Sequence, residues 1–257
     1  MAGAMLEGWA RAGLDLKPIT VIRPSGRPVG HDVRVLSDYP DEPPPALAML
    51  GCKPYQIDQV APKLNPRIGR ETILISILAG VESAALRQRF PGAGAIVKAM
   101  PNMPVRIGKG VTELFSDSPD AAAKDLVEQL MGMLGLAEWF NDEVLFQSAG
   151  MLTGSGPAFL FRFLDALAAA GEKGGLEPER SARLAKAMAE GAAALARASR
   201  DTPHALAAQV ASPNGTTEQG LRVLDEGGAL NDLVGRTLEA ARARSREMAA
   251  EARKPSR

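Results

Sequence analysis

The segment Ser212-Pro-Asn-Gly-Thr-Thr217 places three hydroxyl groups at a turn before a helix. Asn214 and Gly215 tolerate the left-handed backbone that such a turn needs. The N–H groups at a helix start, together with the positive end of the helix dipole, bind carboxylate or phosphate groups. The alternative, which these residues by themselves favour, is plain capping of the helix by Thr216 and Gln219 as a capping box.

A second segment that could carry chemistry is Thr153-Gly-Ser-Gly-Pro-Ala158. Its two glycines allow the backbone to approach a ligand closely, and Pro157 is predicted to open a helix. The same residues are equally compatible with a hinge between two domains, so this segment alone decides nothing.

Small or polar residues follow three predicted strands. Lys53 and Pro54 follow the first, Ala79 and Gly80 the second, and Asn102, held between two prolines, the third. Ligands of open α/β sheets bind at the carboxyl ends of the strands. The three strand ends therefore indicate one crevice, although a surface lysine after a strand is also common.

The turn Arg23-Pro-Ser-Gly-Arg27 follows another predicted strand, Ile19–Ile22. Dinucleotide-binding domains that prefer NAD usually place a carboxylate here to hold the ribose 2′-hydroxyl. Two guanidinium groups and the Ser25 hydroxyl suit a 2′-phosphate instead. The turn favours NADP over NAD, and a plain basic turn is the alternative interpretation.

The elements that must position these residues fall into two halves. Short β-branched runs alternating with helical stretches predict a mostly parallel α/β sheet. The predicted strands are Ile19–Ile22, Val33–Leu36, Ala46–Leu50, Thr72–Leu78, Ala95–Ala99 and Val111–Phe115. From Ser118, the predicted N-cap, and Pro119 onward the pattern is helical and no strand is predicted. We place the domain boundary near residue 148, which gives an α/β domain at 1–148 and an all-helical domain at 149–257.

Composition excludes several classes of function. The chain of 257 residues has 30 Lys and Arg against 30 Asp and Glu, so no net charge steers it to a polyanion. Cys52 is the only cysteine and there are two histidines, so no metal site is expected. The apolar runs are far shorter than the roughly 20 residues of a membrane span. We expect a cytoplasmic protein that binds neither nucleic acid nor membranes.

Taken together, these segments resemble the pyrroline-5-carboxylate reductase family along nearly the whole chain. The matching stretches are Gly51–Gln56, Ser76–Val81, Lys98–Pro104, Leu152–Ala158 and Leu206–Leu224. The resemblance implies a Rossmann-type NADP-binding domain followed by an all-α dimerisation domain. It also implies NADPH-dependent reduction of 1-pyrroline-5-carboxylate to L-proline, the last step of proline biosynthesis, with NAD as the alternative cofactor.

The resemblance also implies roles for individual residues. Thr217 is expected to be the catalytic residue, with a hydroxyl near the imine nitrogen. The substrate-binding residues would be Ser155, Ser212, Asn214, Gly215, Thr216 and Thr217. The cofactor-binding residues would be Met1, Ala2, Arg23, Ser25, Arg27, Cys52, Lys53, Pro54, Ala79, Gly80 and Asn102.

The chain departs from the family at its start. Family members begin with a strand and a Gly-x-Gly-Asn-Met loop, whereas Met1 and Ala2 match the end of that loop. Without that strand and those glycines, cofactor binding should be badly weakened. We expect an upstream start codon and a homodimer or a higher oligomer of dimers. The alternatives are a non-catalytic, truncated dimeric remnant and a reductase of a different cyclic imine.

Overall fold

The computed structural model describes residues 1–117 and 120–252 of the chain. The chain forms two compact units. The first contains Met1–Pro157 and the end of the last helix from Ala241, and the second contains Ala158–Ala240. The predicted domain boundary near residue 148 falls inside a continuous helix and stays a prediction.

The first unit contains two sheets. A five-stranded sheet has the order β3-β4-β5-β6-β7, and β1 and β2 form a separate parallel pair. Among the strands of the described residues, the β5–β6 pair is antiparallel and the other pairs are parallel. The strands are β1 (Thr20–Ile22), β2 (Arg34–Leu36), β3 (Leu47–Leu50), β4 (Ile73–Ser76), β5 (Ala95–Pro101), β6 (Gly110–Ser116) and β7 (Gly135–Phe140). The six predicted strands are confirmed.

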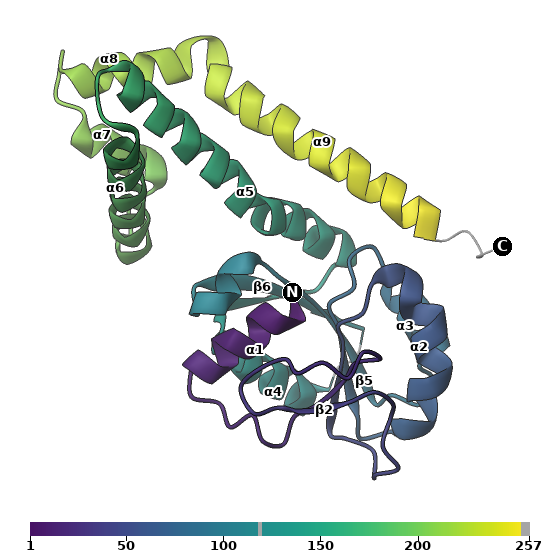
Figure 1. Ribbon diagram of the computed structural model, residues 1–257. Helices are drawn as coiled ribbons and strands as arrows, with labels where there is room; N and C mark the ends of the chain where they lie inside the picture. Colours follow the sequence, from purple (N-terminus) through teal and green to yellow (C-terminus); the bar gives the residue numbers. More distant parts are fainter. Residues whose placement is uncertain (118–119, 253–257) are drawn as a thin grey trace. The chain divides into compact units, whose positions relative to one another are not determined.

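Helices cover both faces of the five-stranded sheet (Figure 1). Alternate residues of β4 point to opposite faces, so Ile75 packs with α1 (Ala2–Arg11) and α4 (Ala121–Gly132). Its neighbour Leu74 packs with α2 (Ile57–Leu64) and α3 (Ser83–Arg89). Short 3₁₀ turns complete the unit: η1 (Pro54–Gln56), η2 (Asn65–Arg67) and η3 (Met103–Ile107). This arrangement confirms the predicted Rossmann-type α/β domain.

β7 (Gly135–Phe140) is a strand where only helix was predicted. It is an edge strand with half-exposed side chains, so its sequence lacks the apolar run that marks a buried strand. Ser118 and Pro119, the predicted helix start, lie outside the described residues. The helix α4 has Asp120 as its N-cap, whose carboxylate accepts the Ala123 N–H.

The helix α5 (Glu143–Lys173) continues through Pro157, so the prediction that this proline opens a helix is wrong. A proline lacks the N–H that would bond to the carbonyl four residues earlier, here that of Thr153. The Asn102 side-chain amide donates to this carbonyl oxygen at 3.1 Å. Because a side chain from the sheet replaces the lost helix bond, the helix does not break.

The second unit consists of the rest of α5 and further helices. They are α6 (Pro178–Ala198), α7 (Pro203–Val210), α8 (Thr216–Asp225), the 3₁₀ turn η4 (Glu226–Gly228) and α9 (Ala229–Ala252). Glu177 and Thr202 are the N-caps of the helices that begin at the following prolines. Within the described ranges, no helix combines the length and the apolar character that a membrane span requires.

The second unit has almost no core of its own. Among residues 158–240 only Ala168 and Ser181 are buried, and the Ser181 hydroxyl donates to the Ala168 carbonyl at 2.7 Å. The large apolar side chains of α6 are about half exposed, including Leu184 at 53%, Met188 at 52% and Leu195 at 59%. Such a surface normally needs a partner to cover it.

Candidate functional site

The carboxyl ends of β3, β4 and β5 carry the polar and small residues that the sequence singled out. Lys53 follows β3 and is exposed, and no acidic side chain in the described residues pairs with it. Gly80 follows β4, is exposed and has a φ of 77°, which a residue with a side chain rarely adopts. Ala79 beside it is exposed too. This edge is open to a ligand.

Asn102, at the end of β5, is 6% exposed, and both the nitrogen and the oxygen of its side chain are hydrogen-bonded within the protein. Its amide donates to the Thr153 carbonyl oxygen, and its side-chain oxygen accepts the Val111 N–H at 2.9 Å. The structure therefore places Asn102 at the predicted edge but uses its side chain to join β5, β6 and α5.

The start of α1 lies at the same edge. A Cβ atom on Gly51, just after β3, would stand 3.1 Å from the Ala2 side chain. Met1 and Ala2 are therefore next to the segment that holds Cys52 and Lys53. Burial raises the pKa of the Cys52 thiol, so the less reactive protonated form is favoured.

The turn after β1 brings the predicted phosphate-binding residues together. The Gly26 N–H donates to the Arg23 carbonyl at 2.8 Å, and the Arg23 guanidinium donates to the Arg27 carbonyl at 3.4 Å. Ser25 lies inside this turn. Arg23, Ser25 and Arg27 are exposed, and neither arginine forms an ion pair within the described part of the chain. Two unneutralised guanidinium groups beside a hydroxyl fit a phosphate.

A buried ion pair fastens the first turn of α5 to the sheet. Lys98 on β5 is 4% exposed, and its ammonium lies 2.6 Å from the Glu143 carboxylate. Glu143 also accepts the N–H and the hydroxyl of Ser83, at the start of α3. Burial alone would raise the pKa of Glu143, but these hydrogen bonds and the Lys98 charge outweigh it and lower the pKa.

Glu113 is a polar residue that sequence reasoning missed. It lies on β6, is 1% exposed and accepts a hydrogen bond from the Thr153 hydroxyl of α5. Burial raises the pKa of its carboxyl group, and the Thr153 hydrogen bond, which acts in the opposite direction, does not cancel the effect. The sequence signal that could have identified Glu113 is its position as a single acidic residue inside the predicted strand Val111–Phe115.

The turn before α8 presents its hydroxyl groups to solvent. Ser212, Thr216 and Thr217 are exposed, and their hydroxyl groups have no hydrogen-bond partner among the described residues. The N-cap of α8 is Gly215 and not Thr216, so the predicted capping box of Thr216 and Gln219 is wrong. Asn214 has a φ of 57°, as its predicted tolerance of left-handed backbone requires.

The first turn of α8 can therefore bind an anion. The N–H groups of Thr216 and Thr217 lack acceptors within the helix. The negative Glu218 carboxylate already lies close to this turn, because it accepts the Asn214 N–H. Arg222, 3.7 Å from Glu218, partly offsets this charge. Thr217, the predicted catalytic residue, shares the first turn with the predicted carboxylate-binding residues.

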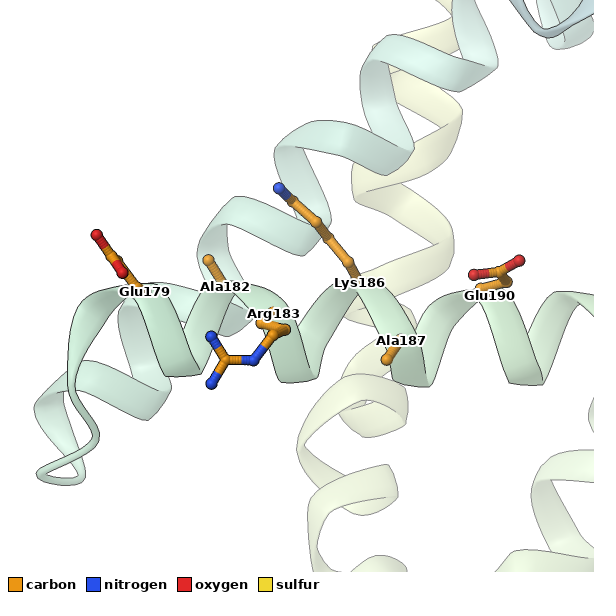
Figure 2. Close-up of a pocket in the computed structure, with 6 residues that line it drawn as sticks. All are labelled: Glu179, Ala182, Arg183, Lys186, Ala187 and Glu190. Carbon is orange, nitrogen blue, oxygen red and sulfur yellow. The ribbon is translucent and has the colours of Figure 1, made fainter. Parts of the chain in front are cut away.

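Ser155 lies on α5, half buried and without a hydrogen-bond partner among the described residues. A shallow hollow runs along α6 and is lined by that helix alone (Figure 2). Its lining residues are Glu179, Ala182, Arg183, Lys186, Ala187 and Glu190. None of them is a predicted site residue.

Comparison with known proteins gives consistent matches. A family model described as pyrroline-5-carboxylate reductase dimerisation matches residues 143–248. The pyrroline-5-carboxylate reductase of Pseudomonas aeruginosa is 35% identical over 204 residues, which are 79% of this chain and 74% of that protein. The enzyme of the same name from Aquifex aeolicus is 34% identical over 198 residues, 77% of this chain and 71% of that protein.

Solved structures match over more of the chain. A pyrroline-5-carboxylate reductase from Coxiella burnetii has a TM-score of 0.86 and 31% identity, and the match covers 96% of this chain and 94% of that one. A Plasmodium falciparum pyrroline carboxylate reductase with NADP bound has a TM-score of 0.81 and 23% identity, over 96% and 93% of the two chains. At that identity the second match shows the shared fold.

Proposed function

Since this chain belongs to the pyrroline-5-carboxylate reductase family, we propose that it reduces 1-pyrroline-5-carboxylate to L-proline with NADPH. This is the last step of proline biosynthesis and an oxidoreductase reaction at a C=N bond. The observation that carries the proposal is the match to the Pseudomonas aeruginosa reductase along most of both chains.

The carboxyl edge of the sheet is the proposed NADPH site. Arg23, Ser25 and Arg27 would hold the 2′-phosphate, because both guanidinium groups are exposed and lack acidic partners in the described residues. The nicotinamide end would lie against Ala79, Gly80 and the segment after β3. The full proposed set is Met1, Ala2, Arg23, Ser25, Arg27, Cys52, Lys53, Pro54, Ala79, Gly80 and Asn102. When bound, NADPH supplies a hydride for the imine carbon.

The α8 turn is the proposed substrate site. The N–H groups of its first turn and the free hydroxyls of Ser212 and Thr216 would bind the substrate carboxylate. Reduction of C=N also needs one proton at nitrogen, and the Thr217 hydroxyl is the group we assign to hold or relay it. Asn214, Gly215 and Ser155 complete the proposed set.

The chain forms a homodimer through its helical unit, in agreement with the dimerisation family model and the exposed apolar side chains of α6. Assembly of dimers into larger oligomers and a cytoplasmic location are part of the proposal.

The test is an assay of the full chain with NADPH and 1-pyrroline-5-carboxylate, in which NADPH absorbance and L-proline are both measured. We expect one proline for each NADPH consumed and no consumption without the imine. NADPH binding without proline formation would favour another cyclic imine as substrate. Absence of NADPH binding would favour the non-catalytic remnant.

A further inference from the structure

Glu113 is a buried carboxyl group that the proposed reaction does not use. It points to the face of the sheet that α5 covers, and one of its oxygens, Oε2, is buried without a hydrogen-bond partner among the described residues. A buried ionised carboxylate is costly unless it is paired and fully hydrogen-bonded. The side chain is therefore better suited to its neutral, protonated form.

Within the described residues, no cation forms an ion pair with Glu113. On the same face of the sheet, Lys98 of β5 is already ion-paired with Glu143 of α5 at 2.6 Å. The register partner of Glu113 on β7 is Glu138, which is exposed and has the same sign of charge. Of these three, Lys98 is the cation, and Glu143 already offsets its charge. The other titratable groups of α5 are exposed and lie well beyond Thr153 along the helix: Arg162, Asp165, Glu172 and Lys173.

The hydrogen bonds of Thr153 also favour a proton on Glu113. The Thr153 hydroxyl lies within hydrogen-bond distance of both Glu113 Oε1 and the Ala149 carbonyl oxygen, the latter at 3.3 Å. A hydroxyl group has one proton and cannot donate to both oxygens at once. If Glu113 carries a proton, it can donate to Thr153 while Thr153 donates to Ala149, and each contact is then satisfied.

Thr153 connects Glu113 to the proposed cofactor edge. Its carbonyl oxygen, which Pro157 leaves without a helix partner, accepts the Asn102 amide. Asn102 is bonded in turn to Val111, through its side chain at 2.9 Å and its backbone N–H at 3.1 Å. One network thus joins β6, α5 and the end of β5.

We propose that Glu113 is a positioning residue whose neutral carboxyl group holds Thr153, and through it Asn102 and the adjoining Ser155, in place for NADPH and substrate. The proposal rests on the proposed reductase function. Glu113 touches neither ligand itself and acts only through this network.

The test compares Glu113→Gln, Glu113→Leu and, as a matched control, Glu138→Gln on the exposed neighbouring strand. Gln is neutral and can still donate to Thr153, whereas Leu cannot. We expect Glu113→Leu to raise the Kd for NADPH roughly fivefold, the equivalent of one hydrogen bond of about 1 kcal/mol. Glu113→Gln and Glu138→Gln should stay within about twofold of the parent protein.

The pH profile separates positioning from simple packing. As pH rises through the raised pKa of Glu113, kcat/KM of the parent should fall relative to that of Glu113→Gln. Thr153→Val should mimic Glu113→Leu, and Thr153→Ser should restore binding. Unchanged NADPH affinity in both Glu113→Leu and Thr153→Val would overturn the proposal.

Thermal unfolding keeps the test independent of activity. The raised pKa of Glu113 stabilises the folded protein below the ordinary carboxyl pKa, and this stabilisation is lost as pH rises through the folded pKa. The Tm of the parent should therefore fall relative to that of Glu113→Gln as pH rises, whereas Glu138→Gln should run parallel to the parent. If the parent shows this pH dependence of Tm but forms no proline, the result contradicts the reductase function and not the protonated Glu113. A Tm difference between the parent and Glu113→Gln that does not change with pH would contradict a protonated Glu113.

Discussion

Two glutamates, Glu143 at the start of α5 and Glu113 on β6, meet opposite electrostatic environments. Glu143 has an ammonium group 2.6 Å away and accepts from Ser83, so it is held ionised. Burial raises the pKa of Glu113, and no salt bridge to it is found among the described residues. Both carboxyl groups connect α5 to the sheet. A rise in pH should strengthen the contribution of Glu143 to folding stability and weaken that of Glu113.

Glu143→Gln should destabilise the protein by about 1.5–3 kcal/mol near neutral pH, because it removes a buried charge-assisted hydrogen bond. The lowered pKa of Glu143 means that its stabilisation exists above the ordinary carboxyl pKa and is lost as pH falls through the folded pKa. Urea unfolding at decreasing pH should show the difference from the parent shrinking.

The matched control is Asp165→Asn, which removes an ion pair with Arg162 whose side chains are 74% and 75% exposed. It should change stability by less than about 1 kcal/mol. A Glu143→Gln variant that is as stable as the parent at neutral pH would contradict the assigned role of the buried pair.

Thr217→Val should lower kcat about 10²-fold if its hydroxyl relays a proton to the imine nitrogen. Because the Thr217 side chain is exposed and unbonded, Tm should not change. Steady-state kinetics with 1-pyrroline-5-carboxylate measure this, and Thr217→Ser should keep most of the activity. An unchanged kcat in Thr217→Val would remove Thr217 from the mechanism.

Arg27→Ala should raise the KM for NADPH roughly tenfold, since it removes a charge-assisted contact with the 2′-phosphate. The KM for NADH, which lacks that phosphate, should not change. Parallel assays with the two cofactors measure the difference. Arg11→Ala, at the far end of α1, is the control, and an equal rise for both cofactors in Arg27→Ala would contradict the phosphate contact.

At the scale of elements, local sequence signals predicted the strands correctly but not the continuation of α5 through Pro157. The six predicted strands lie where the sequence indicated them. The break predicted at Pro157 is absent because Asn102, about fifty residues earlier in the chain, bonds to the carbonyl that the proline leaves free. No window of local sequence contains that information.

The packing of α1 on η3 gives a test at this scale. A Cβ atom on Gly8 would stand 2.2 Å from the Val105 carbonyl oxygen, whereas one on Gly3 of the same helix would meet nothing within 4 Å. Gly8→Ala should therefore destabilise the protein by about 1–3 kcal/mol through overpacking.

Gly3→Ala is the matched control and should be neutral or stabilising by up to about 1 kcal/mol, because alanine favours helix. Urea unfolding at one fixed protein concentration measures both variants. Equal stabilities for the two would mean that α1 does not pack closely on η3.

At the scale of the whole molecule, the two units differ in how they achieve stability. The first buries an apolar cluster on each face of its sheet. The second leaves most of its apolar side chains exposed, and its helices therefore depend on a second copy of the chain to cover them.

The combined substitution Leu184→Glu and Met188→Glu should convert the dimer to monomer, because two charges would be buried at the interface without partners. Sedimentation velocity measures the change. Leu126→Glu, on an equally exposed position of α4 in the first unit, is the control and should stay dimeric. A double variant that remains dimeric would place the interface elsewhere.

The sequence by itself determined the fold class and the family, which the comparisons confirm, and it predicted candidate site residues, which stay a prediction. Strand runs, the polar strand ends and the hydroxyl-rich turn before α8 are local patterns, and local patterns suffice when a residue's role follows from its immediate neighbours in the chain. Only the tertiary structure decided the roles of Asn102, Glu113 and Thr153. Their roles depend on desolvation and on hydrogen bonds between β5, β6 and α5, and those contacts exist only once distant segments pack together.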